Sequence, residues 1–448
     1  MEVETSPTSK IYMEAWLPRN WTGRFLSTGN GGLGGCIQYP DLVYTTSLGF
    51  ATVGANNGHN GTSGAAFENH PQVLADFAFR SIHTNVVIGK QITERFYREP
   101  YKKSYFFGCS TGGRQGLKST EDFPEDFDGV VAGAPAANYI GLVTWSGNFF
   151  TGITGNSSQA TFIPITLWTG LIHDSILSQC DIIDGVNDSI IEDPNTCNYD
   201  PSVLLCRDDS TSHCLTETQV ETVRKVFSPF LASDSETILY PPAQPGSEGL
   251  LLIQKVGGQL FQITSDWFRY VVYNSSFDPT ALALADYELA IRMNPFDIAT
   301  FKGDLVKFRA RGGKLLTYHG QADGLISPRM SEVYYSHAKD VSGSLDDFYR
   351  FFRISGMSHC SGGPGAWQIG QSSVAGTSFD PDKNVLAAMV QWVEHGLAPE
   401  TIEGVKFEND DVGEGVAFRR KHCRFPLRNT YDRRGDPTVP ESWSCQEV

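Results

Sequence analysis

Short apolar runs separated by glycine-rich turns fill the first 135 residues and return after residue 300. Runs with the length and composition of buried β-strands occur at 11–17, 24–28, 50–55, 101–107, 128–135, 314–320 and 349–354. Apolar residues at helical spacing occupy 72–96 and 384–392, and the second of these helices is expected to end before Gly396. Alternating strand and helix patterns predict a parallel sheet covered by helices, which is an α/β fold.

The segment 136–299 breaks this alternation. Aromatic residues scatter there through polar loops, and four of the nine cysteines fall within it. A chain of 448 residues also exceeds what one hydrophobic core usually supports. We therefore expect a catalytic part built from 1–135 and 300–448, with 136–299 inserted as a lid domain.

Composition limits the partners. The formal net charge is −16, which disfavours nucleic acids and anionic membranes as ligands because both are polyanions. No apolar run approaches the roughly 18 residues that a membrane-spanning helix needs. The sequence therefore predicts a soluble protein that binds neither, and it leaves the oligomeric state open, a dimer included.

Cysteines and glycosylation signals both suggest a secretory product. Closely spaced cysteines predict the local disulfides Cys180–Cys197, Cys206–Cys214 and Cys423–Cys445, and no C-x-x-C pattern indicates zinc. Acceptor sites for N-glycosylation begin at Asn20, Asn60, Asn156, Asn187 and Asn274. The first residues do not form a signal peptide, and the cysteine count is odd. We expect a leader and a segment carrying the partner of Cys36 to be absent from this sequence.

A nucleophile motif follows the strand at 101–107. Residues 108–112 read Gly-Cys-Ser-Thr-Gly, the G-x-S-x-G pattern of a nucleophile elbow, with Ser110 at its centre. Small residues two positions before and after the serine let the backbone double back from strand to helix. The pattern predicts the nucleophile of an α/β-hydrolase, and the alternative is a glycine-rich turn with a surface serine.

An oxyanion hole requires backbone N–H groups close to the substrate carbonyl, an approach that glycine permits. The usual pair is the residue after the nucleophile and one residue from an early strand–helix loop. Thr111 and either Gly31 or Gly32 are the candidates. A flexible glycine loop without this role is the alternative.

The acid and the base should follow the serine in chain order. Asp323 lies in the loop after the strand at 314–320 and is the candidate acid. Its rivals sit in helical or turn contexts; they are Asp304, Asp346 and Asp347. His359 lies in a small-residue loop after the strand at 349–354 and is the candidate base. The competing histidines precede the acid or the serine; they are His319, His59 and His70.

Two further cysteines flank the predicted nucleophile and base. Cys109 precedes Ser110, and Cys360 follows His359. If serine and histidine lie within hydrogen-bond reach, their neighbours fall near the Cα separation that a disulfide requires. We predict a Cys109–Cys360 bond that locks the two loops together and prevents Cys109 from acting as nucleophile.

An acidic loop lies between Cys180 and Cys197. Asp181, Asp184 and Asp188 could supply carboxylates to a hard cation such as Ca²⁺, although the spacing is not that of an EF-hand. On composition alone, a solvated acidic loop is an equal alternative.

Three motifs together resemble the tannase/feruloyl esterase family. They are Gly-Cys-Ser-Thr-Gly-Gly-Arg-Gln-Gly at 108–116, Gly-Gln-Ala-Asp at 320–323 and Gly-Met-Ser-His-Cys-Ser-Gly-Gly-Pro-Gly at 356–365. The chain looks most like the fungal type B feruloyl esterases over nearly its whole length. The resemblance implies the triad Ser110, Asp323 and His359 and a lid that binds the aromatic acid. It also implies a structural Ca²⁺ in the lid; the implied ligands are the side chains of Asp181, Asp184 and Asp188 and the carbonyls of Val186 and Ile190.

The resemblance also implies an activity. Family members are secreted enzymes with a signal peptide, which this sequence lacks, and need no organic cofactor. The expected reaction is acyl-enzyme hydrolysis of feruloyl, p-coumaroyl or caffeoyl esters of plant cell-wall polysaccharide such as xylan. Hydrolysis of galloyl esters by a tannase is the nearest alternative. An inactive calcium-dependent binding protein is a remote one.

Overall fold

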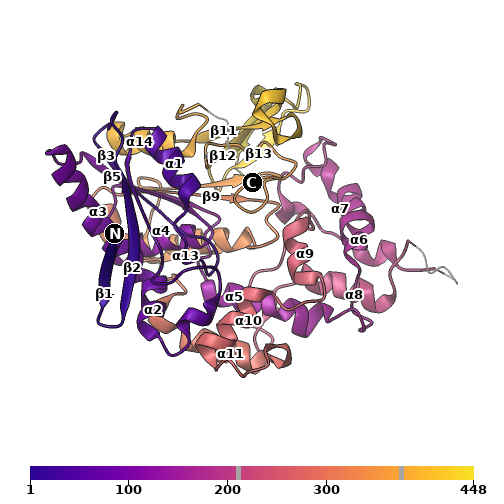
Figure 1. Ribbon diagram of the computed structural model, residues 1–448. Helices are drawn as coiled ribbons and strands as arrows, with labels where there is room; N and C mark the ends of the chain where they lie inside the picture. Colours follow the sequence, from indigo (N-terminus) through magenta and orange to yellow (C-terminus); the bar gives the residue numbers. More distant parts are fainter. Residues whose placement is uncertain (208–212, 373–377, 448) are drawn as a thin grey trace.

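The computed structural model describes residues 1–207, 213–372 and 378–447 (Figure 1). Eight strands form one sheet in the order β1-β2-β4-β3-β5-β6-β9-β10. Their bounds are β1 Glu2–Ser6, β2 Ser9–Trp16, β3 Arg24–Thr28, β4 Ala51–Ala55, β5 Lys103–Cys109, β6 Gly129–Gly133, β9 Lys314–Gly320 and β10 Tyr349–Ile354. The strands from β4 to β10 are parallel, whereas β1 and β2 add an antiparallel edge. All seven predicted strands are therefore confirmed as members of this sheet, and its eighth strand, the polar β1, was not predicted.

The sheet buries both faces, which explains its apolar strands. Neighbouring residues alternate between two hydrophobic clusters: Phe106 points into one, and Tyr105 and Phe107 into the other. Helices α3 (Ser81–Tyr97), α4 (Thr111–Asp122) and α13 (Arg329–Ser342) cover the first face. Helices α1 (Tyr39–Ser47) and α14 (Val385–His395) cover the second. The loops that follow β5, β9 and β10 meet at one edge of this sheet, because the three strands are parallel.

The two predicted helices are present with small changes at their ends. The helix expected at 72–96 is formed by α2 (Pro71–Ala75), a π-helical segment (Asp76–Arg80) and α3. The helix expected at 384–392 is α14, which continues to His395. Gly396 ends it in the left-handed region at φ 73°, where glycine carries no Cβ penalty. The helices α1 and α13 were not predicted.

Mostly helical chain lies between β6 and β9 (Figure 1). Its helices are α5 Tyr139–Asn148, α6 Ile165–Leu167, α7 His173–Cys180, α8 Glu217–Val226, α9 Leu250–Val256, α10 Gln262–Trp267, α11 Leu284–Met293 and α12 Val306–Ala310. Its described strands, β7 (Phe230–Leu231) and β8 (Ile238–Tyr240), pair only with each other. The cluster around Trp145 and Trp267 also contains Phe77 and Ile326 from the sheet-bearing part, so one continuous core is shared by this helical segment and the sheet-bearing part.

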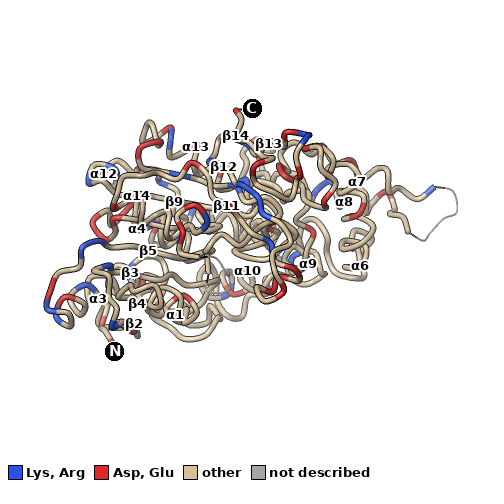
Figure 2. The backbone as a smooth tube through the Cα atoms, turned by 90° about the horizontal axis from the view of Figure 1, so that it is seen from above, with Lys and Arg blue, Asp and Glu red and all other residues tan. Residues whose placement is uncertain are grey.

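Two hairpins complete the chain. They pair β11 (Thr401–Phe407) with β12 (Val416–Cys423) and β13 (Arg428–Tyr431) with β14 (Trp443–Gln446). The Cys423–Cys445 disulfide connects them, and Cys180–Cys197 and Cys206–Cys214 are also formed, so all three predicted local disulfides are confirmed. No helix in the described ranges is long and apolar enough to cross a bilayer. Figure 2 shows basic and acidic residues interspersed along the chain.

Candidate active site

Ser110 occupies the sharp turn between β5 and α4. Its backbone lies at φ 65° and ψ −122°, a conformation that non-glycine residues rarely adopt. The turn is held because the Ser110 N–H donates to the carbonyl of Gly133 at 2.9 Å, and the Ser110 carbonyl accepts from Ala136 at 3.1 Å. The surrounding structure thus fixes the strained serine at the edge of the sheet.

The glycines of the motif are required by close backbone contacts. A Cβ on Gly108 would lie 3.0 Å from the backbone of Gly112. A Cβ on Gly112 would lie 3.0 Å from the carbonyl oxygen of Asn30 in the glycine-rich loop. Both distances are shorter than ordinary van der Waals contact, so the elbow and the early loop approach each other only where side chains are missing.

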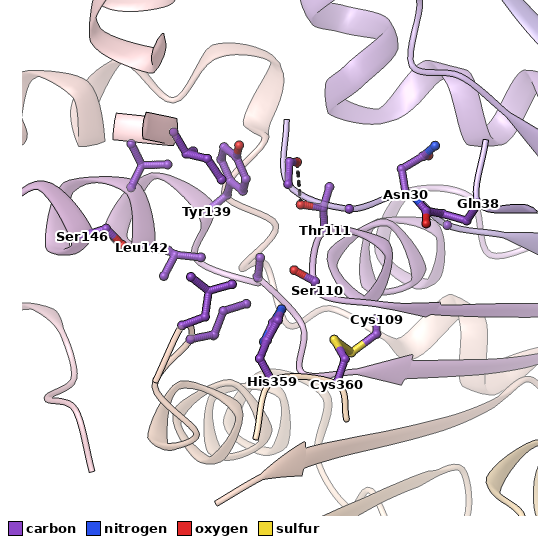
Figure 3. Close-up of a pocket in the computed structure, with 18 of the residues that line it drawn as sticks. Asn30, Gln38, Cys109, Ser110, Thr111, Tyr139, Leu142, Ser146, His359 and Cys360 are labelled. Atoms are coloured by element: carbon purple, nitrogen blue, oxygen red, sulfur yellow. Dashed lines mark hydrogen bonds between the residues drawn. A yellow bond between two sulfur atoms is a disulfide. The ribbon is translucent and has the colours of Figure 1, made fainter. Parts of the chain in front are cut away.

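His359 lies between Ser110 and Asp323. Its Nδ1 donates to Oδ2 of Asp323 at 2.7 Å. The other ring nitrogen, Nε2, points toward the Ser110 hydroxyl (Figure 3). A carboxylate only accepts hydrogen bonds, so this contact fixes the tautomer that leaves Nε2 free to take a proton.

Asp323 is buried and bound through both oxygens. Oδ1 accepts from the N–H groups of Leu325 at 2.8 Å and Ile326 at 2.9 Å. Oδ2 accepts a second imidazole, His319 Nε2, at 3.1 Å beside His359. Burial alone would raise the pKa of Asp323, but the charge of His359 and the hydrogen bonds from His319 and His359 hold it well below its usual range. These contacts therefore favour the ionised carboxylate.

The rival residues lie elsewhere. Among them, only His319 reaches the site. Its Nε2 is hydrogen-bonded to Asp323, and its Nδ1 is hydrogen-bonded to the hydroxyl of Ser331. Asp346 and Asp347 are exposed and pair with arginines. Asp304 is exposed and receives the N–H of Val306, His59 binds backbone carbonyls, and His70 is exposed.

The disulfide predicted between the catalytic loops is formed. Cys109 and Cys360 are joined at an S–S distance of 2.05 Å, and their Cα atoms are 6.1 Å apart. Figure 3 shows this bond directly beside Ser110 and His359. It links the end of β5 to the loop after β10, across 251 residues of sequence. Cys109 is consequently unavailable as a nucleophile.

Thr111, Gly31 and Gly32 all border the same space as Ser110. The Thr111 hydroxyl donates to the carbonyl of Gly32 at 2.8 Å and so ties the elbow to the early loop. Gly32 has φ 58°, in the left-handed region that favours glycine. Thr111 is the first residue of α4, a position where the backbone N–H has no partner inside the helix. This arrangement can present N–H groups to a developing oxyanion.

A cavity of about 400 Å³ opens in front of Ser110 and His359. Helix α5, the residues just before it and the start of α10 supply one wall, which is mostly apolar; its residues are Ala136, Tyr139, Leu142, Val143, Ser146, Phe261 and Ile263. Leu325 and Ile326 of the acid loop continue it. Gln38 and Asp41 stand at the start of α1 beside the glycine loop. The cavity is large enough for a substituted aromatic ester.

Comparison with known proteins agrees with this geometry. The family model described as "Tannase and feruloyl esterase" matches residues 1–283 and 276–446. The chain belongs to this family. A probable feruloyl esterase B-1 from Aspergillus flavus is 53% identical over 99% of this chain and 85% of its own length. The expected α/β-hydrolase fold is confirmed by this membership and by the solved relatives.

Two solved structures of family members are similar throughout. An esterase from Aspergillus oryzae is 53% identical with a TM-score of 0.97, over 99% of this chain and 89% of that one. Feruloyl esterase B from Aspergillus oryzae is 48% identical with a TM-score of 0.96, over 99% of this chain and 90% of that one. The fold of this chain is therefore that of the tannase and feruloyl esterase family from end to end.

One buried residue that contacts the loop of Asp323 escaped sequence reasoning. Lys255 of α9 is 1% exposed, and its Nζ donates to the carbonyl of Gly324 at 3.2 Å and to that of Leu325 at 2.5 Å. The same Nζ lies 3.7 Å from the ring centroid of Trp145 on α5. Burial lowers the pKa of Lys255 well below its usual value. In the sequence, the only indication that Lys255 is buried is its position just after the apolar run 250–253.

The acidic loop contains one oxygen that suits a cation. Asp181 accepts the N–H of Ser189 at 3.0 Å, and Asp188 pairs with Arg420 at 2.8 Å. Asp184 receives the N–H of Val186 through Oδ1, while its Oδ2 is buried without a hydrogen-bond partner in the described part of the chain. Burial raises the pKa of Asp184 to about 7.

The donor chemistry of this loop fits Ca²⁺, since carboxylate and carbonyl oxygens are its usual ligands. Val186 and Ile190, whose carbonyls complete the expected set, are both buried beside the acidic residues. Across the described ranges, however, no three His, Cys, Asp or Glu side chains lie close enough to hold a metal together. The orphaned Asp184 oxygen is thus the feature of the loop that points to a cation.

Proposed function

We propose that this carboxylic ester hydrolase cleaves hydroxycinnamoyl esters of plant cell-wall polysaccharide through an acyl-enzyme formed on Ser110. The observation that carries the proposal is the His359 imidazole, which is hydrogen-bonded to Asp323 and turned toward Ser110 in a cavity with an apolar wall. The names of the relatives, feruloyl esterase B among them, support the same substrate class.

The reaction takes two steps with His359 moving the proton in each. In acylation, Nε2 removes the Ser110 proton as Oγ attacks the ester carbonyl, and Thr111 with Gly31 or Gly32 binds the oxyanion. Nε2 then protonates the leaving alcohol as its C–O bond breaks. In deacylation, His359 takes a proton from water, the hydroxide attacks the acyl carbon, and Ser110 recovers its proton. Asp323 remains ionised and orients the imidazole.

Covalent labelling tests the nucleophile. A fluorophosphonate should modify the folded wild-type chain at Ser110 and should not modify the Ser110→Ala variant. Absence of labelling in folded wild-type protein would overturn the enzyme proposal and favour an inactive binding protein instead.

The acyl group is tested by a substrate series. Methyl ferulate, methyl caffeate, methyl p-coumarate and methyl gallate share the leaving group and differ only in the acid. We expect the three hydroxycinnamates to have the higher kcat/KM. The family description covers tannases as well. A tenfold preference for gallate would assign this chain to the tannase side.

A structural Ca²⁺ is part of the proposal. Its ligands would be the carboxylates of Asp181, Asp184 and Asp188 and the carbonyls of Val186 and Ile190. The unpartnered Asp184 oxygen supports this site, and a bound cation would hold Asp184 ionised. The ion would brace the lid, and the chemistry on Ser110 requires no metal.

Secretion and glycosylation complete the proposal. All five asparagines of the acceptor sites are exposed, as glycan attachment requires. The four disulfides fit an oxidising compartment. Expression in a secretory host followed by endoglycosidase digestion should give a downward mobility shift. Unchanged mobility would contradict glycosylation.

A further inference from the structure

The cavity contains polar side chains that the proposed chemistry does not use. On the α5 wall, the hydroxyls of Ser146 and Tyr139 are buried and have no hydrogen-bond partner in the described structure. Beside the glycine loop, Gln38 and Asp41 form no side-chain hydrogen bond or ion pair with any residue described. Buried polar groups are normally paired, so the two buried hydroxyls indicate places where a ligand completes the bonding. Gln38 and Asp41 are half-buried in the same cavity, and their polar atoms are open to a ligand.

These groups lie on two sides of the nucleophile. Figure 3 shows Ser146, Leu142 and Tyr139 on one side of Ser110 and Gln38 on the other. Gln38 is the N-cap of α1 and Asp41 is three residues further, so both side chains lie on one face of the helix start. We call Gln38 and Asp41 the α1 group. An ester bound at Ser110 therefore places one of its two parts, acid or alcohol, against the α5 wall and the other against the α1 group.

The α5 wall suits an aromatic ring that carries a hydroxyl. Leu142 and Val143 are apolar and flank the cavity one turn before Ser146. Figure 3 shows the Ser146 side chain directed from α5 toward the space in front of Ser110. The Ser146 side chain is 1% exposed, so a hydrogen bond made to it is shielded from water. A phenolic hydroxyl pairs with such a group, whereas an unsubstituted ring leaves it unpaired.

The α1 group suits an alcohol with several hydroxyls. An amide and a carboxyl side by side offer both donors and acceptors, the combination that sugar hydroxyls need. Neighbouring Asn30 cannot serve, because its side chain is already bonded to Cys36, Ala55 and Gln115. Burial raises the pKa of Asp41 to about 7, as expected for a carboxyl that lacks a protein partner.

We propose that the cavity binds the ester across Ser110, with the ring hydroxyl of the acyl group on Ser146 and the sugar hydroxyls of the leaving alcohol on Gln38 and Asp41. The inference rests on the proposed ester hydrolysis and deepens it. Ser146 and Asp41 become specificity-determining residues for opposite parts of one substrate. The alcohol is then a carbohydrate rather than a simple alkyl group.

Three substrates separate the two contacts. Methyl ferulate is the reference, methyl 3-methoxycinnamate lacks the ring hydroxyl, and a feruloyl ester of arabinose replaces methanol by a sugar. Ser146→Ala should lower kcat/KM about tenfold for methyl ferulate and leave methyl 3-methoxycinnamate within twofold, because one hydrogen bond is lost only with the first. The matched control is Thr144→Val on the same helix, since Thr144 is buried and bonds the carbonyl of Gly141.

The alcohol contact is tested at Asp41. Asp41→Ala should lower kcat/KM about tenfold for the arabinose ester and leave methyl ferulate within twofold. Asp41→Asn should retain most of the sugar preference, because an amide still donates and accepts. Asp174→Asn is the control, since Asp174 is an exposed acid in the first turn of α7. Fluorophosphonate labelling of every variant verifies that Ser110 remains reactive.

Each outcome is decisive. Equal losses on all three substrates for either variant would overturn the assignment of that residue. The orientation would be reversed, and the proposal overturned, by two results together. Ser146→Ala would lower kcat/KM only for the arabinose ester, and Asp41→Ala would lower it only for esters that carry the ring hydroxyl. Failure of the proposed function gives a different result: the wild-type chain prefers methyl gallate or hydrolyses no ester. In the gallate case, sugar and methyl gallates measure the same Asp41 contact.

Discussion

The two sides of the active-site cavity use their polar groups in opposite ways. At the sheet edge, Asp323 is bonded through both oxygens, and the Thr111 hydroxyl is bonded to the glycine loop. On the α5 wall, the hydroxyls of Ser146 and Tyr139 have no partner among the described residues. The groups at the sheet edge are thus oriented by the protein itself, whereas the hydroxyls of the α5 wall can gain hydrogen bonds only from a ligand.

This contrast has an energetic basis. A catalytic group contributes most when its orientation is fixed before substrate arrives, and protein hydrogen bonds supply that fixation. A recognition group contributes most when it lacks a partner in the free protein and gains one in the complex. Changes at the sheet edge should therefore lower kcat for every ester alike, and changes on the α5 wall should alter the choice of ester.

The largest effect is expected from Asp323→Asn. The amide keeps the shape but can donate to His359 Nδ1, which favours the tautomer that cannot take the Ser110 proton. We expect kcat to fall about 10³- to 10⁴-fold with all esters, measured by steady-state kinetics, with little change in KM. Asp304→Asn is the control, because Asp304 is exposed and remote from His359. A selective loss on one ester would place Asp323 in recognition instead.

The next effect is expected at Lys255, which contacts the acid loop through Gly324 and Leu325 and helix α5 through the ring of Trp145. Lys255→Met fills the same space but leaves the carbonyls of Gly324 and Leu325 without their donor. Because Leu325 in this loop also donates its N–H to Asp323, we expect kcat to fall about 10- to 100-fold, with KM nearly unchanged. The exposed Lys339→Met is the control. A rise in KM with constant kcat would show that Lys255 serves the α5 wall through Trp145 rather than the acid loop.

A smaller effect on turnover is expected from removing the Cys109–Cys360 bond. The Cys109→Ala/Cys360→Ala double variant should lose about 2–5 kcal/mol of unfolding free energy, because the bond closes a loop of 251 residues. We expect kcat to fall about tenfold as Ser110 and His359 lose their fixed separation. The Cys206→Ala/Cys214→Ala variant removes a remote bond across 8 residues and is the control. Full activity in the first variant would refute its positioning role.

The smallest effect on catalysis is expected from calcium removal. Chelation with EDTA should lower the Tm by several degrees, because a bound ion stabilises only the folded state. Added Ca²⁺ should restore it, and kcat at 25 °C should change less than twofold. An Asp184→Asn variant should show no response to EDTA. Equal melting of the wild type with and without EDTA would remove the metal from the proposal.

Most of the central sheet could be predicted from the sequence, because each buried strand has its own apolar run. The strands β3, β9 and β10 lie where their apolar runs predicted, since a strand buried on both faces needs such a run. Strand β1, read as Glu-Val-Glu-Thr-Ser, carries no such signal and exists because β2 pairs with it. The helix α13 contains Tyr334 and Tyr335 at its buried positions among polar neighbours, and its pattern was too mixed to recognise.

The residues of the candidate site that lie in sequence motifs could also be predicted. Ser110, Asp323 and His359 follow the chain order that is usual in this fold. The cysteines beside Ser110 and His359 can form a disulfide only if these two residues lie close together. Partnerships that cross elements were not readable. His319 and Lys255 converge on Asp323 from β9 and α9, and only tertiary packing makes them neighbours. Ser146 likewise becomes notable only once its hydroxyl is found without a partner.

The position of the Cys109–Cys360 bond has a consequence for proteolysis. The bond spans the whole segment between β6 and β9, with Ser110 on one side of that segment and Asp323 and His359 on the other. A single backbone cut by a protease within this segment therefore yields two chains that remain covalently attached. The nicked molecule keeps Ser110, Asp323 and His359 in one particle, and it separates into two fragments only when it is both denatured and reduced. Cleavage between β6 and β9 thus gives a two-chain form of the esterase whose parts are joined covalently beside the active site.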